Sequence, residues 1–246
     1  MMNITKAVMH LIIANVLFFI LAVFVPVIQD KAALYYFENP EFHWWQLFSH
    51  LFMHGSIPHL FFNMFALYSF GAPLEHYFGS NRFILFYFAC GLGAGLLHMG
   101  VNYYEFHAGL DLLQSKGFEI EEARALLKKG MYDTRWKEVL SQGDFNDMMS
   151  AYMTRAVGAS GAIYGILVAF GMLFPNAELM LMFLPIPIKA KYFIPILIAL
   201  DLFSGVTGVS IFGSNIAHFA HVGGALIGFV LMKLWQKRSF EDRRLY

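Results

Sequence analysis

The chain has 246 residues, of which 58% are hydrophobic, 17% are aromatic and 14% are charged, and its formal net charge is +0. This composition is too apolar for an ordinary soluble domain and indicates a polytopic membrane protein, and the balanced charge gives no sign of a nucleic-acid partner. The single cysteine, Cys90, excludes an intrachain disulfide and a zinc site built from thiolates.

Six apolar stretches are predicted to span the membrane, and the first, at 21 residues, is about as long as the roughly 20 residues that a bilayer core needs. They cover residues 8–28, 56–78, 83–102, 158–174, 192–206 and 218–235. The first stretch follows Lys6 in the manner of a signal peptide, but no small-residue cleavage site comes after it, so we expect a retained helix. The predicted fold class is all-α: a single polytopic membrane domain over residues 1–246, built as a bundle of six transmembrane helices.

Two segments between these stretches are expected to lie outside the bundle. The first loop, residues 29–49, interleaves polar and aromatic side chains, as is typical of the membrane interface. Residues 103–155 are rich in charge and are predicted to form an aqueous insertion of helices and loops between the third and fourth spans. Within it, acidic residues precede lysines over 119–129, which suits a helix dipole, and a second short helix is expected over 144–153.

The connection between the fourth and fifth spans, residues 179–188, is nearly as apolar as a span. Pro185 and Pro187 interrupt it, and proline lacks the backbone donor that a helix interior needs. We therefore expect an interfacial connection that does not cross the membrane.

The positive charges in the short connections predict the orientation. In a six-helix arrangement they all fall on one side, which the positive-inside rule makes cytoplasmic. These residues are Lys6, Arg82, Lys189, Lys191, Lys233, Lys237 and Arg238. We therefore expect a multi-pass protein of the inner (plasma) membrane with both termini in the cytoplasm, and with the insertion and the start of the fourth span on the external or periplasmic side.

Residues 158–165, which read G-A-S-G-A-I-Y-G, place a serine hydroxyl among glycines at the start of the fourth span. One explanation is helix packing, in which Gly161 and Gly165 form a small-xxx-small face and Ser160 bonds to a carbonyl one turn earlier. The alternative is that Ser160 is a nucleophile, which requires a base elsewhere in the chain.

The second span carries His59 and Asn63, polar residues that are costly in a membrane and by default suggest function. Because they are four residues apart, they share one helix face and could hold one ligand oxygen together. The alternative for His59 is a core imidazole bonded to a backbone carbonyl. His50 and His54, just before the span, are expected to be structural residues that bond loop carbonyls.

A metal site is an alternative use of these histidines, since imidazole is the commonest metal-ligand side chain. However, Gly55 and Pro58 break the helical register between them, and no H-E-x-x-H motif is present. We therefore expect no metal and no other cofactor.

His221 opens the sixth span and is followed on the same face by small residues within 224–228. If this face packs against the glycines of the fourth span, Ser160 and His221 meet near the external end, as in a serine activated by a histidine base. Tyr164, one turn deeper than the serine, could support the imidazole ring. No motif ties a carboxylate to His221, and Asp201 in the fifth span could pair elsewhere, so a Ser-His dyad is predicted.

Together these residues resemble the rhomboid intramembrane serine proteases over all six spans. The stretches G-A-S-G at 158–161, A-H-V-G-G at 220–224 and H-G-S-I-P-H-L-F-F-N at 54–63 match the family's G-x-S-G, histidine and H-x4-H-x3-N motifs. The resemblance implies Ser160 as nucleophile, His221 as base, His59 and Asn63 in the oxyanion hole, and Tyr164, Gly158 and His54 as supporting residues. The family's Trp-Arg pair of the first loop reads Trp45-Gln46 here, which leaves the anchoring of that loop open.

The implied function is that of a serine endopeptidase that cleaves transmembrane substrates near their external end through an acyl-enzyme. The expected partners are those substrates and the lipid bilayer. One alternative is a non-catalytic rhomboid-like membrane-protein binding or quality-control factor, which usually lacks the serine or the histidine. Another is a histidine-lined transporter, but the face below Ser160 continues with Tyr164 and Leu167 and so closes the polar path.

Overall fold

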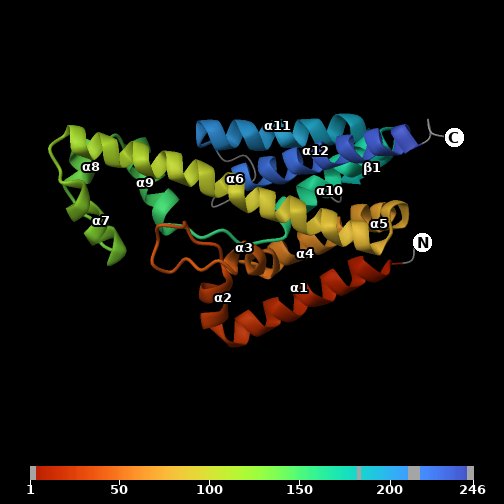
Figure 1. Cartoon of the computed structure of the whole chain (residues 1–246), viewed down its shortest axis with the longest axis horizontal. Helices are drawn as coiled ribbons and strands as arrows, with labels where there is room; N and C mark the ends of the chain where they lie inside the picture. Colours follow the sequence, from red (N-terminus) through yellow and green to blue (C-terminus); the bar gives the residue numbers. More distant parts are fainter. Residues whose placement is uncertain (1–3, 182–183, 210–216, 243–246) are drawn as a thin grey trace.

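The computed structural model describes residues 4–181, 184–209 and 217–242 (Figure 1). Its helices are α1 (Lys6–Phe24), α2 (Pro26–Ala32), α3 (Gln46–Ser49), the 3-10 helix η1 (His50–Phe52), α4 (Ile57–Ala66), the π-helix η2 (Leu67–Gly71), α5 (Ala72–Phe78), α6 (Ser80–Ser115), α7 (Ile120–Lys128), α8 (Trp136–Val139), α9 (Gln142–Met153), α10 (Ser160–Leu173), α11 (Ala190–Thr207) and α12 (His218–Asp242). Two strands, β1 (Glu178–Leu181) and β2 (Leu184–Lys189), complete the described elements.

Several helices of the described chain are long and apolar enough to cross a membrane. By length and composition these are α1, α6, α11 and residues 218–236 of α12. The helix α10 is equally apolar but has 14 residues, and the predicted second span is divided into α4, η2 and α5. The chain is therefore a largely helical membrane protein.

The predicted first span, residues 8–28, ends too late. The helix α1 stops at Phe24, and a new short helix, α2, begins with Pro26 in its first turn. Proline cannot donate the backbone hydrogen bond that a continuing helix needs there, but it fits the first turn of a new one. At the other end of the chain, α12 continues to Asp242, beyond the predicted end at 235.

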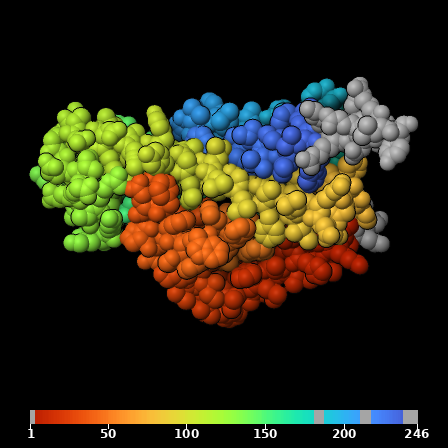
Figure 2. Space-filling view, in the orientation of Figure 1, coloured from red at the N-terminus to blue at the C-terminus, as the bar shows by residue number. Residues whose placement is uncertain are grey.

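The predicted third span is also too short, because α6 runs on for 36 residues to Ser115. Phe106, Leu110 and Leu113 recur at helical spacing and are buried in a second core formed with α7, α8 and α9. The insertion predicted over 103–155 therefore begins as a direct extension of a spanning helix. Figure 2 shows this part, in green, projecting from one end of the molecule against the first loop, in orange.

The helices predicted within the insertion, 119–129 and 144–153, are confirmed as α7 and α9, whereas the short α8 was not predicted. The predicted connection 179–188 is an antiparallel hairpin in which Leu179 pairs with Ile188, so the all-α prediction is wrong in this detail. Its residues 182–183 lie outside the described part. A two-stranded sheet leaves one edge of each strand unpaired, so it tolerates prolines that a helix would not.

The centre of the bundle consists of α6, α10 and α12, which pack with backbones in close contact. A Cβ atom on Gly224 of α12 would overlap the carbonyl oxygen of Gly161 in α10, and one on Gly228 would lie 2.7 Å from Gly165 Cα. Only residues without a side chain permit this approach. The predicted contact between the small faces of these two helices is therefore confirmed, and it fixes how the first turn of α10 faces the first turn of α12.

Candidate active site

The turn before α10 depends on the unusual backbone conformation of Gly158. Its φ is 122°, a conformation that L side chains rarely adopt, and its amide donates to the carbonyl of His50 at 2.9 Å. Two residues earlier, Ala156 forms an antiparallel bridge with Leu34 of the first loop. These contacts deliver Ser160 as the first residue of α10 at a fixed position against the loop.

The hydroxyl of Ser160 faces the imidazole of His221 on α12. Ser160 Oγ and His221 Nε2 are 2.8 Å apart, within hydrogen-bonding distance. The ring of Tyr164, one turn deeper in α10, lies parallel to the imidazole, with ring centroids 4.2 Å apart and an interplanar angle of 12°. The arrangement places a hydroxyl within hydrogen-bonding distance of an imidazole that is stacked on an aromatic ring, a geometry in which a histidine can accept a serine proton.

A carboxylate stands on the opposite side of the imidazole. Asp201 Oδ1 is 3.3 Å from His221 Nδ1 and 2.6 Å from His218 Nδ1, and the hydroxyl of Tyr164 donates to Asp201 Oδ2. The expectation that no carboxylate accompanies His221 is therefore wrong. Two signals in the sequence pointed to it: an aspartate within a span is costly unless it is paired, and His218 lies on the same face as His221, three residues before it.

The predicted oxyanion residues lie on α4, which begins beside the turn at Gly158. Ser56 caps α4 by accepting a hydrogen bond from the amide of His59 at 3.2 Å. The side chain of His59 reaches the turn, since a Cβ atom on Gly158 would lie 2.8 Å from its Nε2 and 3.6 Å from Ser160 Oγ. The imidazole of His59 and the hydroxyl of Ser160 therefore border one small space.

Asn63 lies one turn further along α4 and is 6% exposed. Its Nδ2 is buried and has no hydrogen-bond partner in the described part of the chain. Leaving such a donor unsatisfied is costly, so a polar partner is expected for it.

The two histidines before α4 occupy different surroundings. His50 is buried and its Nδ1 lies 2.7 Å from the carbonyl oxygen of Gln46, so the expected structural contact is confirmed. The ring of His54 packs edge to face against His59, with centroids 5.0 Å apart. Neither ring nitrogen of His54 has a hydrogen-bond partner among the described residues, so the expected bond to a loop carbonyl is not found, and its ring packs against His59 instead.

Gln46, which stands in place of the family's arginine, anchors the first loop. It is fully buried, its Oε1 accepts from the amides of Tyr35 at 3.3 Å and His43 at 3.1 Å, and its Nε2 donates to the carbonyl of Glu41 at 2.8 Å. Because its amide both donates and accepts, it satisfies N–H and C=O groups of the loop together. Gln46 therefore anchors the first loop through its side-chain amide.

Arg155 ties the same loop to the segment that leads into α10. Its guanidinium forms an ion pair with Asp30 and donates to the hydroxyl of Tyr35 at 3.2 Å. Burial alone would lower the pKa of this guanidinium, but the hydrogen bonds to Tyr35 and Asp30 raise it above its usual value. Arg155 therefore stays charged and holds the loop in place.

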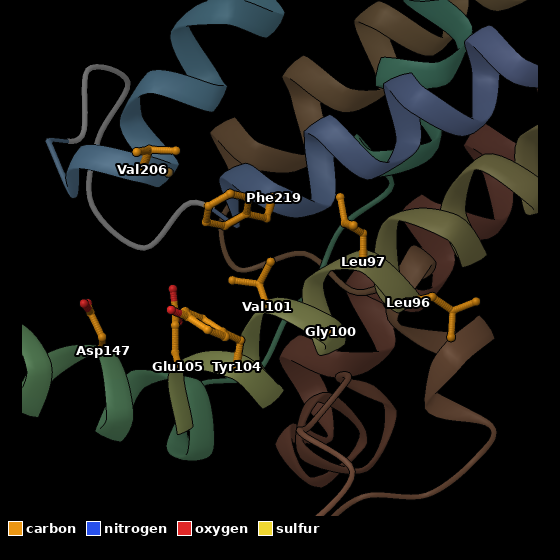
Figure 3. Close-up of a pocket in the computed structure, with 10 residues that line it drawn as sticks. Leu96, Leu97, Gly100, Val101, Tyr104, Glu105, Asp147, Val206 and Phe219 are labelled. Atoms are coloured by element: carbon orange, nitrogen blue, oxygen red, sulfur yellow. The ribbon is translucent and has the colours of Figure 1, made fainter. Parts of the chain in front are cut away.

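No group of three or more histidine, cysteine, aspartate or glutamate side chains within residues 4–181, 184–209 and 217–242 is arranged to hold a metal ion. A separate cavity of about 480 Å³ opens between α6, α9, α11 and α12 (Figure 3). Glu105 and Asp147 point into it beside the apolar side chains of Val101, Val206 and Phe219. None of the predicted site residues lines this cavity.

Comparisons with known proteins point to one family. The chain matches the Rhomboid domain over residues 41–111 and 139–238. The stretch between these matches, 112–138, falls within the predicted insertion.

Three curated relatives have similar identities. An uncharacterized mitochondrial rhomboid protein of Schizosaccharomyces pombe is 29% identical over 82% of this chain and 54% of its own length. The rhomboid protease AarA of Providencia stuartii is 26% identical over 76% of this chain and 54% of its own length, and the mitochondrial RHOMBOID-like protein 12 of Arabidopsis thaliana is 29% identical over 79% and 47%. The chain thus spans about half the length of these relatives. Since the match to the domain covers more than half of the chain, the protein belongs to the rhomboid family.

Proposed function

We propose that the protein is an intramembrane serine endopeptidase that cleaves transmembrane segments near their external end. The observation that carries this proposal is the 2.8 Å contact between Ser160 Oγ and His221 Nε2 in the first turns of two closely packed helices. Membership in a family that includes the proteases AarA and GluP supports it.

In the proposed reaction, His221 Nε2 accepts the proton of Ser160 while Oγ attacks the carbonyl carbon of the scissile peptide bond. The negative charge that develops on the carbonyl oxygen is held by the backbone N–H of Ser160 and by the side chains of His59 and Asn63. The C–N bond then breaks, and the leaving amine takes the proton from His221. Water next attacks the carbonyl carbon of the acyl-enzyme while His221 accepts its proton. The C–Oγ bond then breaks, His221 returns the proton to Oγ, and the carboxylic acid product leaves with Ser160 regenerated.

The unpaired amide of Asn63 supports this assignment. A donor that is buried and has no partner in the described chain is available to a developing oxyanion, and it needs no reorganisation to bind it. His59, one turn before Asn63 on α4, borders the space beside Ser160 Oγ.

The proposed setting is a multi-pass protein with six spans, in which α4 to α5 and α10 cross together with α1, α6, α11 and α12. The start of α1 and the far end of α12 lie at one end of the molecule in Figure 1, and α7 to α9 lie at the other. The positive charges of the short connections lie at the terminal end, so the proposed orientation has the termini in the cytoplasm of a bacterial-type plasma membrane and the site opening on the external side.

The test is cleavage of a single-span substrate by the purified protein in lipid vesicles. Wild type is expected to release two fragments, Ser160→Ala none, and Ser115→Ala, which removes an exposed serine hydroxyl at the end of α6, the same amount as wild type. Equal fragment release by wild type and Ser160→Ala would overturn the proposal. Binding of the span without cleavage by wild type would instead favour the non-catalytic alternative.

A further inference from the structure

We infer that Asp201 is a positioning residue that fixes the tautomer and orientation of His221, and that His218 in turn holds Asp201. This inference rests on the proposed function, because it concerns the base of the same reaction. It replaces the Ser-His pair by a chain of four side chains running from Ser160 through His221 and Asp201 to His218.

The carboxylate of Asp201 is buried but fully hydrogen-bonded to neighbouring side chains. Asp201 is 1% exposed, yet its carboxylate contacts three side chains from two other helices: His218 and His221 on α12, and Tyr164 on α10. A buried carboxylate is stable only with such partners. Its position is therefore determined by the groups that surround Ser160.

The contact with Asp201 also determines which ring nitrogen of His221 carries the proton. An ionised carboxylate can only accept hydrogen bonds, so the ring nitrogen of His221 that faces Asp201 must carry a hydrogen. That nitrogen is Nδ1, which leaves the lone pair of neutral His221 on Nε2, the atom 2.8 Å from Ser160 Oγ. Asp201 thus selects the one tautomer that can accept the serine proton.

Tyr164 contacts both the imidazole of His221 and the carboxylate of Asp201. Tyr164 stacks on the face of His221 and donates its hydroxyl to Asp201 Oδ2. The plane of the imidazole and the carboxylate that it points to are therefore set by one residue. When His221 becomes an imidazolium, Asp201 is the carboxylate placed to stabilise the charge.

His218 is the tether of the carboxylate. Its Nδ1 lies 2.6 Å from Asp201 Oδ1, closer than the 3.3 Å of His221 Nδ1 to the same atom. Gly205 makes room for this approach, since a Cβ atom there would lie 3.4 Å from the Cβ of His218 and 3.1 Å from the ring of Phe219. The 2.6 Å contact of Asp201 with His218 holds α11 to α12, and the 3.3 Å contact with His221 orients the base.

Asp201→Asn keeps the size of the side chain but presents an amide that can donate to Nδ1 and so permit the wrong tautomer. We expect kcat to fall by about 10³- to 10⁴-fold, by analogy with the triad aspartate of soluble serine proteases, and KM to stay within about threefold. The rate at which a fluorophosphonate labels Ser160 should fall with kcat, while the thermal unfolding midpoint stays close to that of wild type. Retention of kcat and of the labelling rate within about threefold would overturn the inference.

Asp201→Ala serves as the second variant in case the asparagine form is unstable. A merely structural role would lower the unfolding midpoint but leave the labelling rate of the folded fraction unchanged, and that result would also overturn the inference. If wild type shows no cleavage dependent on Ser160, the proposed function fails, whereas the labelling rates of wild type and Asp201→Asn still decide whether Asp201 sets the reactivity of Ser160.

The tether is tested by a double-mutant cycle. His218→Gln is expected to lower kcat by about tenfold in the wild-type background and to have no effect in the Asp201→Asn background. The control His76→Gln changes an exposed histidine on α5 and should leave kcat unchanged. Equal effects of His218→Gln in both backgrounds would show that His218 does not act through Asp201.

Discussion

Gly158 and His59 meet so closely that the turn before Ser160 has no room for a side chain. A Cβ atom on Gly158 would lie 2.8 Å from His59 Nε2 and 2.9 Å from its Cε1, and the φ of 122° disfavours any L side chain at this position. Because Gly158 has no Cβ atom, Ser160 and His59, the predicted oxyanion histidine, can lie close together on either side of it.

Gly158→Ala should therefore inactivate the site without unfolding the bundle. A displacement of about 1 Å at a reacting group typically costs about 100-fold in rate, and we expect at least that loss in kcat. The measurement is cleavage of the single-span substrate beside a thermal unfolding curve. Gly55→Ala is the matched control, because a Cβ atom there meets nothing within 4 Å, and it should cleave at the wild-type rate.

Asn63→Ala should lower kcat by about 100- to 1000-fold, the usual effect of removing one oxyanion donor. Because Nδ2 has no partner in the described chain, its removal should not lower the unfolding midpoint. Asn15→Ala removes a buried amide that donates to the carbonyl of Leu11 at 2.7 Å in α1, and it should leave cleavage unchanged. A lower midpoint with normal kcat for Asn63→Ala would assign this residue to the scaffold.

Gly224→Ala should separate α10 from α12, because the added Cβ atom would overlap the backbone of Gly161. Overpacking of this kind typically lowers the free energy of unfolding by about 1–3 kcal/mol, and we expect the widened distance between Ser160 and His221 to lower kcat by about 100-fold. Gly100→Ala makes the same change in α6, where nothing lies within 4 Å of the new atom. It should be neutral in both measurements, and a similar loss there would argue against close packing as the cause.

Gln46→Arg should lower the free energy of unfolding although it restores the residue common in the family. Arginine has no acceptor, so the amides of Tyr35 and His43 would lose Oε1, at about 1–3 kcal/mol for each buried donor left unsatisfied. Chemical denaturation in detergent measures the difference. Gln114→Arg on the exposed side of α6 is the control and should leave the free energy of unfolding unchanged.

The contact between Ser160 and His221 could be anticipated because both helices carry glycines at helical spacing on one face, and packing of these faces brings the two residues together. Asp201 could not be assigned in the same manner. It is connected to His221 through the placement of α11, which depends on the hairpin before it and on the close approach at Gly205. A sequence motif does not record such a contact, since the partners lie 20 residues apart with no fixed spacing rule.

The length of α6 was missed for a different reason. The apolar run ends near Asn102, so hydropathy alone ends the span there. The helix continues because Phe106, Leu110 and Leu113 recur at intervals of four and three residues, a pattern that faces the second core and was present in the sequence. Charge in the segment obscured this periodicity.

The unbroken helix α6 also sets a clearance between a substrate's external domain and the membrane. Its 36 residues span about 54 Å at about 1.5 Å per residue, whereas the hydrocarbon core is about 30 Å thick. In the proposed orientation, roughly 20 Å of α6 therefore stands outside and carries α7, α8 and α9. If the protein cleaves spans as proposed, we expect a folded domain joined directly to a substrate's span to meet this stalk, and an extended tether of about six residues, at about 3.3 Å each, to relieve the clash.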